Sequence, residues 1–391
     1  MKKSRLTSIF LFAVIFLNSI SSICIHADDE QNELLTSYVL MEMTTGTVIM
    51  ENNADEAVPV GTMAKLMTIL LAAEKINSGE LSLDTKLKAS AAANAMQGAQ
   101  IWLMPGEEMT LGDLLKGIII GNANDASVAV AEAVAGSEES FITLMNEKAQ
   151  SLGMKSTSFT NCNGYYDDSR QISSACDIAK LSCELYKYAF LRDYFTCWLD
   201  YLRDGETEVV NSNTLVKNYN GTVGFKAGFT EASGHCISAA AERDGEAYAV
   251  VILGYSDKDS MFYDAKQLLN TGFSEYSVVK PDIPEDTPDI IKVKGSYTKD
   301  IPLEYGNIKN IVIPNGTYNS ISSRYFLPDY IYAPVNKGDK IGEVHFYKND
   351  KFLFSVNILS DGCADKLTGS AILQDAFQHV YPALRPVCTD D

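Results

Sequence analysis

The chain has 391 residues, 46% of them hydrophobic, and a formal net charge of −19. This charge argues against nucleic acid or an anionic lipid surface as a partner, and the length exceeds what one compact core usually holds, so two domains are expected. The eight cysteines and four histidines show no metal-ligand spacing, so neither a metal nor another cofactor is expected, while a disulfide is left open.

The N-terminus has the layout of a secretory signal peptide. Basic residues within positions 1–5 precede a mostly apolar run over residues 6–23, and Ala27 suits the position before a cleavage point. Polar side chains interrupt the apolar run, which leaves it short for a membrane anchor. We therefore expect residues 1–27 to be removed as the protein is secreted across the cytoplasmic membrane, into the cell envelope or the medium.

The first domain is predicted to start with a hairpin. The segment SYVLMEMTTGTVIMENN, residues 37–53, alternates between apolar and polar side chains and turns at Thr45 and Gly46. A helix begins near Thr62, because apolar residues recur there at helical spacing. Further helices are expected over residues 110–120, 126–136, 137–153, 177–190 and 260–273.

Strands follow the helical block. Residues 222–256 are typical of strands, with a tight turn at Asp244 and Gly245. A hairpin, a block of helices, further strands and a last helix make one α+β domain over residues 34–275. In this domain the helices are expected to pack on an antiparallel sheet.

The rest of the chain divides into a linker, a small β domain and a tail. Prolines among acidic residues predict a stiff linker over residues 276–289. Short alternating segments separated by Gly, Asn and Asp turns predict an all-β, sandwich-like domain over residues 290–362. In the tail, residues 363–391, apolar side chains are spaced as in a short amphipathic helix. This helix either packs on the β domain or contacts a membrane.

Thr62 and Lys65 form the first candidate pair for chemistry. Residues three apart on a helix share a face, so the hydroxyl and the amine can meet. A lysine whose pKa is lowered by burial can remove the proton of a hydroxyl that then attacks a carbonyl group. The histidines are too scattered for a histidine-based triad. The ordinary alternative is a threonine that caps a helix and a lysine at the surface.

Two further segments carry candidate residues. Asn122 and Asn124 lie in the turn GNAND between two predicted helices, and a predicted strand carries Lys226, Ala227 and Gly228. An exposed strand edge at Ala227 and Gly228 can receive an extended peptide and its terminal carboxylate. The hypothesis is that all three segments line one cleft between the helical block and the sheet edge.

The three segments, in this order, resemble the signatures of the serine-type D-Ala-D-Ala carboxypeptidases, which are low-molecular-weight penicillin-binding proteins of peptidase family S11. Those signatures are SxxK, SxN and KTG, where this chain has TMAK, NAN and KAG. The stretches LLKGIIIGNANDAS and GFKAGFTEASGHC are similar to the family as well, and the resemblance covers roughly residues 34–360. It implies a β-lactamase/transpeptidase-like domain followed by a small β domain. The implied partners are peptidoglycan stem peptides that end in D-Ala-D-Ala, and β-lactams.

The resemblance assigns a role to each candidate residue. The catalytic positions are Thr62, Lys65 and Asn122, and the substrate-binding positions are Asn124, Lys226, Ala227 and Gly228. The chain departs from the family at every active-site hydroxyl. Thr62 replaces the serine of SxxK, Asn122 replaces the serine of SxN, and Ala227 replaces the threonine of KTG.

These departures predict weakened catalysis. An amide at position 122 is a poor proton relay, and positioned acid–base groups contribute about 10²–10⁴-fold. An alanine at position 227 loses a hydrogen bond to the carboxylate of the substrate, about 1.5–3 kcal/mol. Two hypotheses are left open. The first is a carboxypeptidase that removes terminal D-alanine through an acyl-enzyme at a reduced rate. The second is an inactive homologue that serves as a cell-wall peptide-binding or scaffolding module.

Overall fold

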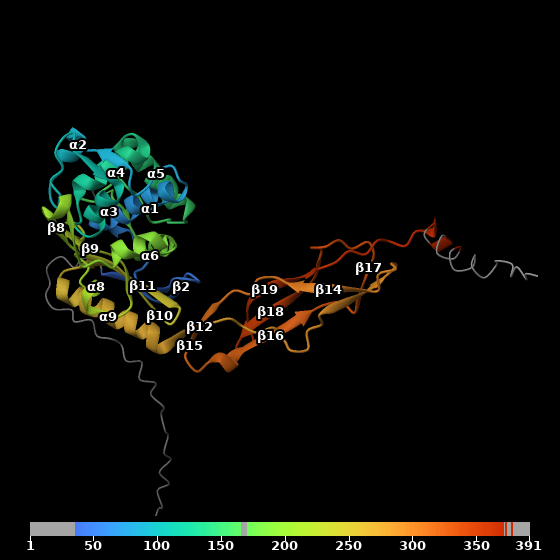
Figure 1. The fold of residues 1–391 in the computed structure, drawn as a ribbon. Helices are drawn as coiled ribbons and strands as arrows, with labels where there is room; N and C mark the ends of the chain where they lie inside the picture. The colour runs from blue at the N-terminus through green and yellow to red at the C-terminus, as the bar shows by residue number, and fades with distance from the viewer. Residues whose placement is uncertain (1–35, 166–169, 371, 374–376, 378–391) are drawn as a thin grey trace, which may run out of the picture. The chain divides into compact units, whose positions relative to one another are not determined.

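The computed structural model of the protein describes residues 36–165, 170–370, 372, 373 and 377 (Figure 1). The expected signal peptide lies outside these residues, as does most of the expected tail helix. Three apolar side chains of that helix are described and all are exposed, namely Ile372, Leu373 and Phe377. Within the described ranges, no helix is both long enough and apolar enough to span a bilayer.

An antiparallel sheet forms the centre of the first domain. In the described part of the chain it has five strands in the order β2-β1-β11-β10-β9. The strands are β1 (Ser37–Glu42), β2 (Thr47–Asn52), β9 (Thr222–Thr230), β10 (Gly234–Arg243) and β11 (Glu246–Tyr255). Both predicted hairpins are confirmed. Asp244 and Gly245 have φ values of 52° and 86°, the left-handed conformations that a two-residue hairpin turn requires. Strand β9 lies at an edge of this sheet.

Helices cover both faces of the sheet (Figure 1). On β11, Val251 and Leu253 belong to the core that includes the helical block, whereas Val250 and Ile252 pack in a second core with α9 (Lys258–Glu275). Successive side chains of a strand point to opposite faces, so an uninterrupted apolar strand such as β11 is buried on both sides. The sheet is therefore the middle layer between two hydrophobic cores.

The helical block forms as the sequence predicts. Its main helices are α1 (Ala64–Asn77), α3 (Leu111–Ile119), α4 (Asn124–Ala135), α5 (Glu138–Ser151) and α6 (Ala175–Tyr186). Ser137 caps α5, since its hydroxyl accepts a hydrogen bond from the backbone N–H of Ser140 at 3.2 Å. Helix α1 is buried on all sides from Ala64 to Ala73, which explains why its sequence shows no polar face there.

Short elements that the sequence pattern does not predict connect these parts. The short helices are α2 (Ala91–Asn94), α7 (Arg192–Phe195), α8 (Leu215–Asn218), η1 (Gly61–Met63), η2 (Ala189–Leu191) and η3 (Arg203–Gly205). The small strand pairs are β3 (Val58–Pro59) with β6 (Ile172–Ser173), β4 (Lys86–Lys88) with β5 (Glu108–Thr110), and β7 (Leu199–Leu202) with β8 (Thr207–Val210). Such short strands carry too few side chains for an alternating pattern to appear.

Asp125 fixes the position of the loop between α2 and β5. Its carboxylate is buried and accepts hydrogen bonds from the backbone N–H groups of Ile101 (3.1 Å), Leu103 (3.0 Å) and Ala126 (2.9 Å). Several amide donors replace the water that a carboxylate loses on burial. Asp125 thereby ties this loop to the first turn of α4.

Replacing Asp125 with alanine is expected to lower the free energy of unfolding by roughly 3 kcal/mol, because buried N–H groups lose a charged acceptor. Urea unfolding measures this change. The matched control is Asp84→Ala, at an exposed aspartate, for which a change below about 0.5 kcal/mol is expected. Equal effects of the two substitutions would contradict the structural role of Asp125.

The C-terminal part is a β-rich domain, as predicted. Among its described residues, six strands form a sheet in the order β16-β18-β19-β14-β13-β17. They are β13 (Ile290–Lys294), β14 (Asp300–Tyr305), β16 (Ile321–Phe326), β17 (Tyr330–Tyr332), β18 (Lys340–Lys348) and β19 (Lys351–Ser360), with a short helix η4 (Tyr318–Ser320) before β16. Val344, Phe346 and Ile358 are buried in its core.

Part of the segment expected to be a linker, residues 276–289, forms a strand. Its first four residues form strand β12 (Tyr276–Val279), which pairs antiparallel with β15 (Ile311–Pro314). The sequence YSVV carries aromatic and β-branched side chains that favour a strand, and the prolines begin only at Pro281. The prediction was therefore wrong for these four residues.

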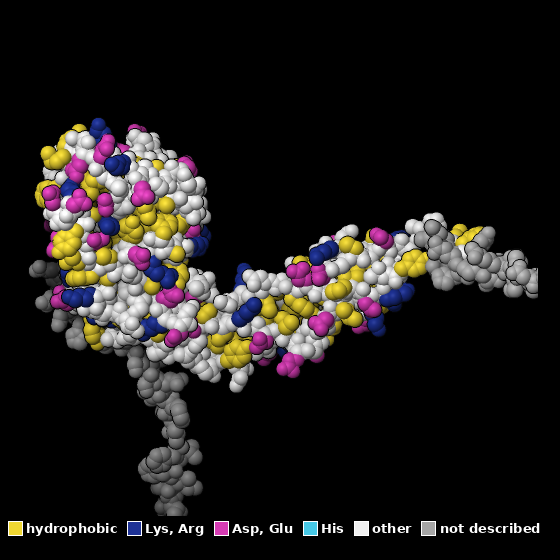
Figure 2. Space-filling model, viewed as in Figure 1, with side chains coloured by type: hydrophobic (Ala, Val, Ile, Leu, Met, Phe, Trp, Pro, Cys, Tyr) yellow, Lys and Arg dark blue, Asp and Glu magenta, His cyan; other side chains and the backbone are white. Residues whose placement is uncertain are grey.

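The charged side chains are interspersed rather than gathered by sign. Figure 2 shows Lys and Arg next to Asp and Glu over the visible face, with hydrophobic side chains between them. The excess of acidic residues is thus spread over this face. Mixed charges of this kind create no large field of one sign there.

Candidate active site

Thr62 lies in the turn η1, directly before α1. Its side chain is buried, and its Oγ1 atom has no hydrogen-bond partner among the described residues. Gly228 of strand β9 touches it, since a Cβ atom added at Gly228 would lie 2.0 Å from Thr62 Oγ1. Only glycine fits at this close approach. The start of the helical block and the edge strand of the sheet therefore meet at Thr62.

Lys65, one turn further on, is completely buried. Its Nζ atom donates a hydrogen bond to the backbone oxygen of Asn163 at 2.6 Å. Burial lowers the pKa of Lys65 to about 7, although the nearby Cys162 and Asp125 act in the opposite direction. A lysine with this pKa is half neutral at pH 7 and can accept a proton. The spacing of Thr62 and Lys65 would allow their side chains to meet. In the structure, however, Lys65 Nζ bonds to the backbone oxygen of Asn163 and not to Thr62 Oγ1.

The loop that receives Lys65 is held by Asn161. Its Oδ1 atom accepts hydrogen bonds from the backbone N–H groups of Asn163 (3.2 Å) and Gly164 (2.6 Å). Gly164 has φ +71°, and a Cβ atom added there would lie 1.7 Å from the backbone oxygen of Gly61. The motifs in the sequence did not single out these residues. The run NCNG, with two asparagines and a glycine, was the available signal of a tight turn.

Asn122 and Asn124 occupy the junction of α3 and α4, as predicted, but they point to different surroundings. Asn122 has φ +59°, a left-handed conformation that asparagine tolerates, and its Oδ1 atom is buried without a hydrogen-bond partner among the described residues. Asn124 is buried at the start of α4, and its Nδ2 atom donates to the backbone oxygen of Gln97 at 2.6 Å.

Lys226 extends from β9 into the helical block. It is fully buried, and its Nζ atom donates to the backbone oxygens of Ile118 (2.7 Å) and Ile119 (3.4 Å) at the end of α3. Burial, and then the positive charge of Lys65, hold the pKa of Lys226 well below its usual range. Lys65 therefore lies close enough to Lys226 for its charge to act on the second amine. Lys226 also places a donor at the carbonyl end of a helix, where one is favourable.

The next residue, Ala227, belongs to the opposite face of the strand. Its side chain is buried in the core shared with α9. Its backbone oxygen accepts a hydrogen bond from Ser212 Oγ at 2.5 Å. This oxygen therefore points away from β10, toward the open edge of the sheet.

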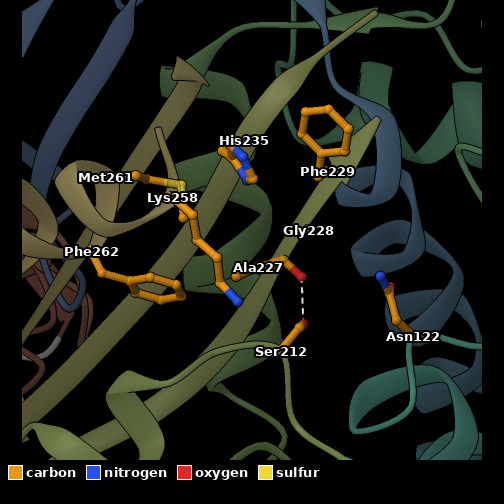
Figure 3. A pocket seen from close by; sticks show the side chains of 9 residues that line it. All are labelled: Asn122, Ser212, Ala227, Gly228, Phe229, His235, Lys258, Met261 and Phe262. Carbon is orange, nitrogen blue, oxygen red and sulfur yellow. Dashed lines mark hydrogen bonds between the residues drawn. The ribbon is translucent and has the colours of Figure 1, made fainter. Parts of the chain in front are cut away.

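A pocket of about 240 Å³ opens beside this edge (Figure 3). Three predicted residues line it, and six others that the sequence analysis missed complete it: Asn122, Ala227, Gly228, Ser212, Phe229, His235, Lys258, Met261 and Phe262. Thr62 adjoins the pocket through Gly228. Asn124 instead contacts the loop of Gln97. No local sequence pattern indicated that the first turns of α9 would return to β9.

The site shows no arrangement for a metal. Within the described residues, no group of three or more His, Cys, Asp or Glu side chains is placed to hold an ion. The described cysteines are free thiols, Cys162, Cys176, Cys183, Cys197, Cys236 and Cys363. Cys24 and Cys388 lie outside the described residues.

Comparison with protein families identifies the class to which this fold and site belong. The family model of D-alanyl-D-alanine carboxypeptidase matches residues 27–257, and the model of the penicillin-binding protein 5 C-terminal domain matches residues 284–363. The chain belongs to the D-alanyl-D-alanine carboxypeptidase family, the low-molecular-weight penicillin-binding proteins that act on peptidoglycan in the cell envelope.

Individual relatives extend over most of the chain. The D-alanyl-D-alanine carboxypeptidase DacF of Bacillus subtilis is 34% identical over 357 residues, which cover 89% of this chain and 92% of the relative. DacC of Escherichia coli is 31% identical over 81% of this chain and 80% of its own length.

Solved structures show the same fold. Penicillin-binding protein 5 of Haemophilus influenzae superposes with a TM-score of 0.76 at 24% identity, over 87% of this chain and 100% of that one. Penicillin-binding protein D2 of Listeria monocytogenes, solved in an ampicillin-bound form, matches with a TM-score of 0.56 at 25% identity, over 63% of this chain and 100% of that one.

Proposed function

We propose that the protein binds peptidoglycan stem peptides ending in D-Ala-D-Ala and releases the last D-alanine slowly through an acyl-enzyme on Thr62. The observation that carries this proposal is the burial of Lys65, which lowers its pKa to about 7. A neutral amine of this kind, one helical turn from a hydroxyl, is the base that a site without histidine requires.

The reaction would proceed in two steps. Lys65 Nζ takes the proton of the Thr62 hydroxyl while Oγ1 bonds to the carbonyl carbon of the penultimate D-alanine. The peptide bond then breaks, the proton passes to the departing amine, and an ester on Thr62 remains. Water hydrolyses this ester, which returns the hydroxyl and leaves a peptide shorter by one residue.

The other site residues would bind and position the substrate. The outer edge of β9 at Ala227 and Gly228 would receive the peptide as an additional strand. Lys226 braces the end of α3, and Asn124 fixes the loop of Gln97. Asn122 faces the pocket and would contact the substrate backbone.

Three features support a slow reaction. Thr62 Oγ1 is enclosed and makes no hydrogen bond to Lys65 or to any other described residue. Asn122 offers an amide where a proton relay is needed, a step worth about 10²–10⁴-fold. Ala227 offers a buried methyl group in place of a hydroxyl, which loses about 1.5–3 kcal/mol for a hydrogen bond to a carboxylate.

A covalent label tests the proposal directly. Incubation of the purified protein with a fluorescent penicillin is expected to yield a slowly formed adduct, which peptide mass spectrometry places on Thr62. The Thr62→Ala variant serves as the control and should remain unlabelled. Release of D-alanine from diacetyl-L-lysyl-D-alanyl-D-alanine should accompany labelling. The absence of any adduct at high protein concentration and long times would refute the enzymatic proposal.

The enclosed Thr62 hydroxyl also favours a second candidate function, a cell-wall peptide-binding or scaffolding module without catalysis. In that case the peptide would bind at the β9 edge without turnover. Calorimetric binding of a stem peptide, together with unchanged peptide after long incubation, would identify this function.

The proposal includes the cellular context. Export by removal of residues 1–27 would deliver the protein to the cell envelope, where its substrate lies. The division into a catalytic domain at 34–275 and a β domain at 290–362 belongs to this proposal too. Contact of the tail with a membrane is supported by three exposed apolar side chains, Ile372, Leu373 and Phe377.

A further inference from the structure

The pocket beside β9 has one wall that the proposed reaction does not use. This wall consists of Lys258, Met261 and Phe262, which come from the first turns of α9. In Figure 3 these side chains lie on one side of β9, and Asn122 lies on the other. Whatever lies along the open edge of β9 at Ala227 therefore passes beside Lys258.

Lys258 gives this pocket its charge. Among the described residues that line the pocket, it alone carries a fixed charge. Burial, and then the positive charge of Lys258, lower the pKa of His235 below its usual range, while Asp257 acts in the opposite direction. His235 is therefore mostly neutral at pH 7. Lys258 and His235 line the same pocket, so the ammonium lies near the imidazole.

The strand itself offers no group that can replace this charge. Ala227 has no side-chain donor, and Ser212 already donates its hydroxyl proton to the backbone oxygen of Ala227. Met261 and Phe262 contribute only apolar surface. Apart from the Asn122 amide, the pocket holds one strong donor for an anion, and that donor is Lys258.

We propose that the ammonium of Lys258 holds the terminal carboxylate of a peptide extended along β9. The assignment rests on the proposed function and names the residue that would give the site its preference for a free C-terminus. Lys258 is a flexible and largely exposed side chain, so its contribution is modest. An ion pair of this kind supports about a fivefold difference in affinity.

Matched peptides and variants test the assignment. Binding of diacetyl-L-lysyl-D-alanyl-D-alanine and of its C-terminal amide is measured by calorimetry. The unsubstituted protein is expected to bind the free acid more tightly than the amide. In Lys258→Gln the ratio of these two affinities should fall about fivefold. Lys258→Arg, which keeps the charge, should retain it. The control is Lys266→Gln, on the same helix but outside the pocket, which should bind as the unsubstituted protein does.

A second measurement follows the pocket without a ligand. An NMR titration of the His235 ring should show its pKa rising in Lys258→Gln, because a neighbouring positive charge is removed. The same preference for the free acid in Lys258→Gln and in the unsubstituted protein would overturn the assignment while leaving the proposed function intact. An unchanged His235 pKa would overturn it as well. Failure of the unsubstituted protein to bind either peptide would overturn the proposed function, and the assignment with it.

Discussion

Restoring the three hydroxyl positions in one chain, as Thr62→Ser, Asn122→Ser and Ala227→Thr, is expected to raise the rate of D-alanine release at least about 100-fold. A serine at position 122 returns a proton relay, which alone is worth about 10²–10⁴-fold. A threonine at position 227 returns a donor for the carboxylate, about 1.5–3 kcal/mol. The gains need not multiply, because residues that act as one unit are not additive.

Serine at position 62 should contribute by steric relief. The Thr62 side chain lies against Gly228, since a Cβ atom added there would stand 2.0 Å from Thr62 Oγ1 and 3.1 Å from Thr62 Cγ2. A β-branched side chain also has a restricted χ1 angle. Serine lacks the methyl group, so its oxygen can rotate toward Lys65 and toward a carbonyl carbon in the cleft.

The experiment is a steady-state assay with diacetyl-L-lysyl-D-alanyl-D-alanine. The control replaces position 62 with alanine while keeping the two other restorations, and it should release no D-alanine. Thermal unfolding of each variant checks that Ala227→Thr is tolerated, because that side chain packs against the core of α9. If the folded triple variant releases D-alanine no faster than the starting protein, the cleft does not work as proposed.

Replacing Lys65 with methionine is expected to abolish labelling by penicillin and, at the same time, to stabilise the fold near pH 7. Acylation needs the neutral amine, so in the unsubstituted protein its rate should rise with pH up to about 7 and level off above. Methionine removes the base but fills a similar volume. The loss should be at least about 100-fold, because a positioned base contributes about 10²–10⁴-fold.

The effect on stability has the opposite sign. In the folded protein the pKa of Lys65 is about 7, below the ordinary lysine value of 10.5 that applies to an unfolded chain. Between these two pH values the unfolded state binds more protons, so the free energy of unfolding rises with pH across this window. Below pH 7 the buried amine is charged, and the full free-energy cost of burying this charge destabilises the folded state. Methionine removes this cost, so Lys65→Met should unfold several degrees higher at pH 7.

Thermal unfolding at several pH values measures this behaviour, and Lys86→Met, at an exposed lysine, is the control. Lys226 remains in both proteins and keeps its own pH dependence in the same direction. A Lys65→Met variant that is less stable than the unsubstituted protein at pH 7 would show that the buried amine is structural. Such a result would contradict its role as a strained functional base.

The sequence predicted the long elements of the fold because their patterns are local. The alternation around Gly46, the uninterrupted apolar strand β11 and the cap at Ser137 each depend on neighbours within a few residues. The motifs TMAK, NAN and KAG located the candidate site because their order along the chain is distinctive. The residues of strand β12 were predicted to belong to the linker because several prolines follow them closely in the sequence.

What the sequence by itself determined is the class of fold, the two candidate lysines and the change at three active-site hydroxyl positions, of which Thr62 alone keeps a hydroxyl group. Only the tertiary structure decided how these groups behave. The pKa of Lys65 depends on desolvation by segments far along the chain, such as the loop at Asn163. The enclosure of Thr62 by Gly228, and the approach of Lys258 to the β9 edge, likewise arise where distant segments pack together. Burial and electrostatic interactions act through space, so neither can be read from the order of residues along the chain.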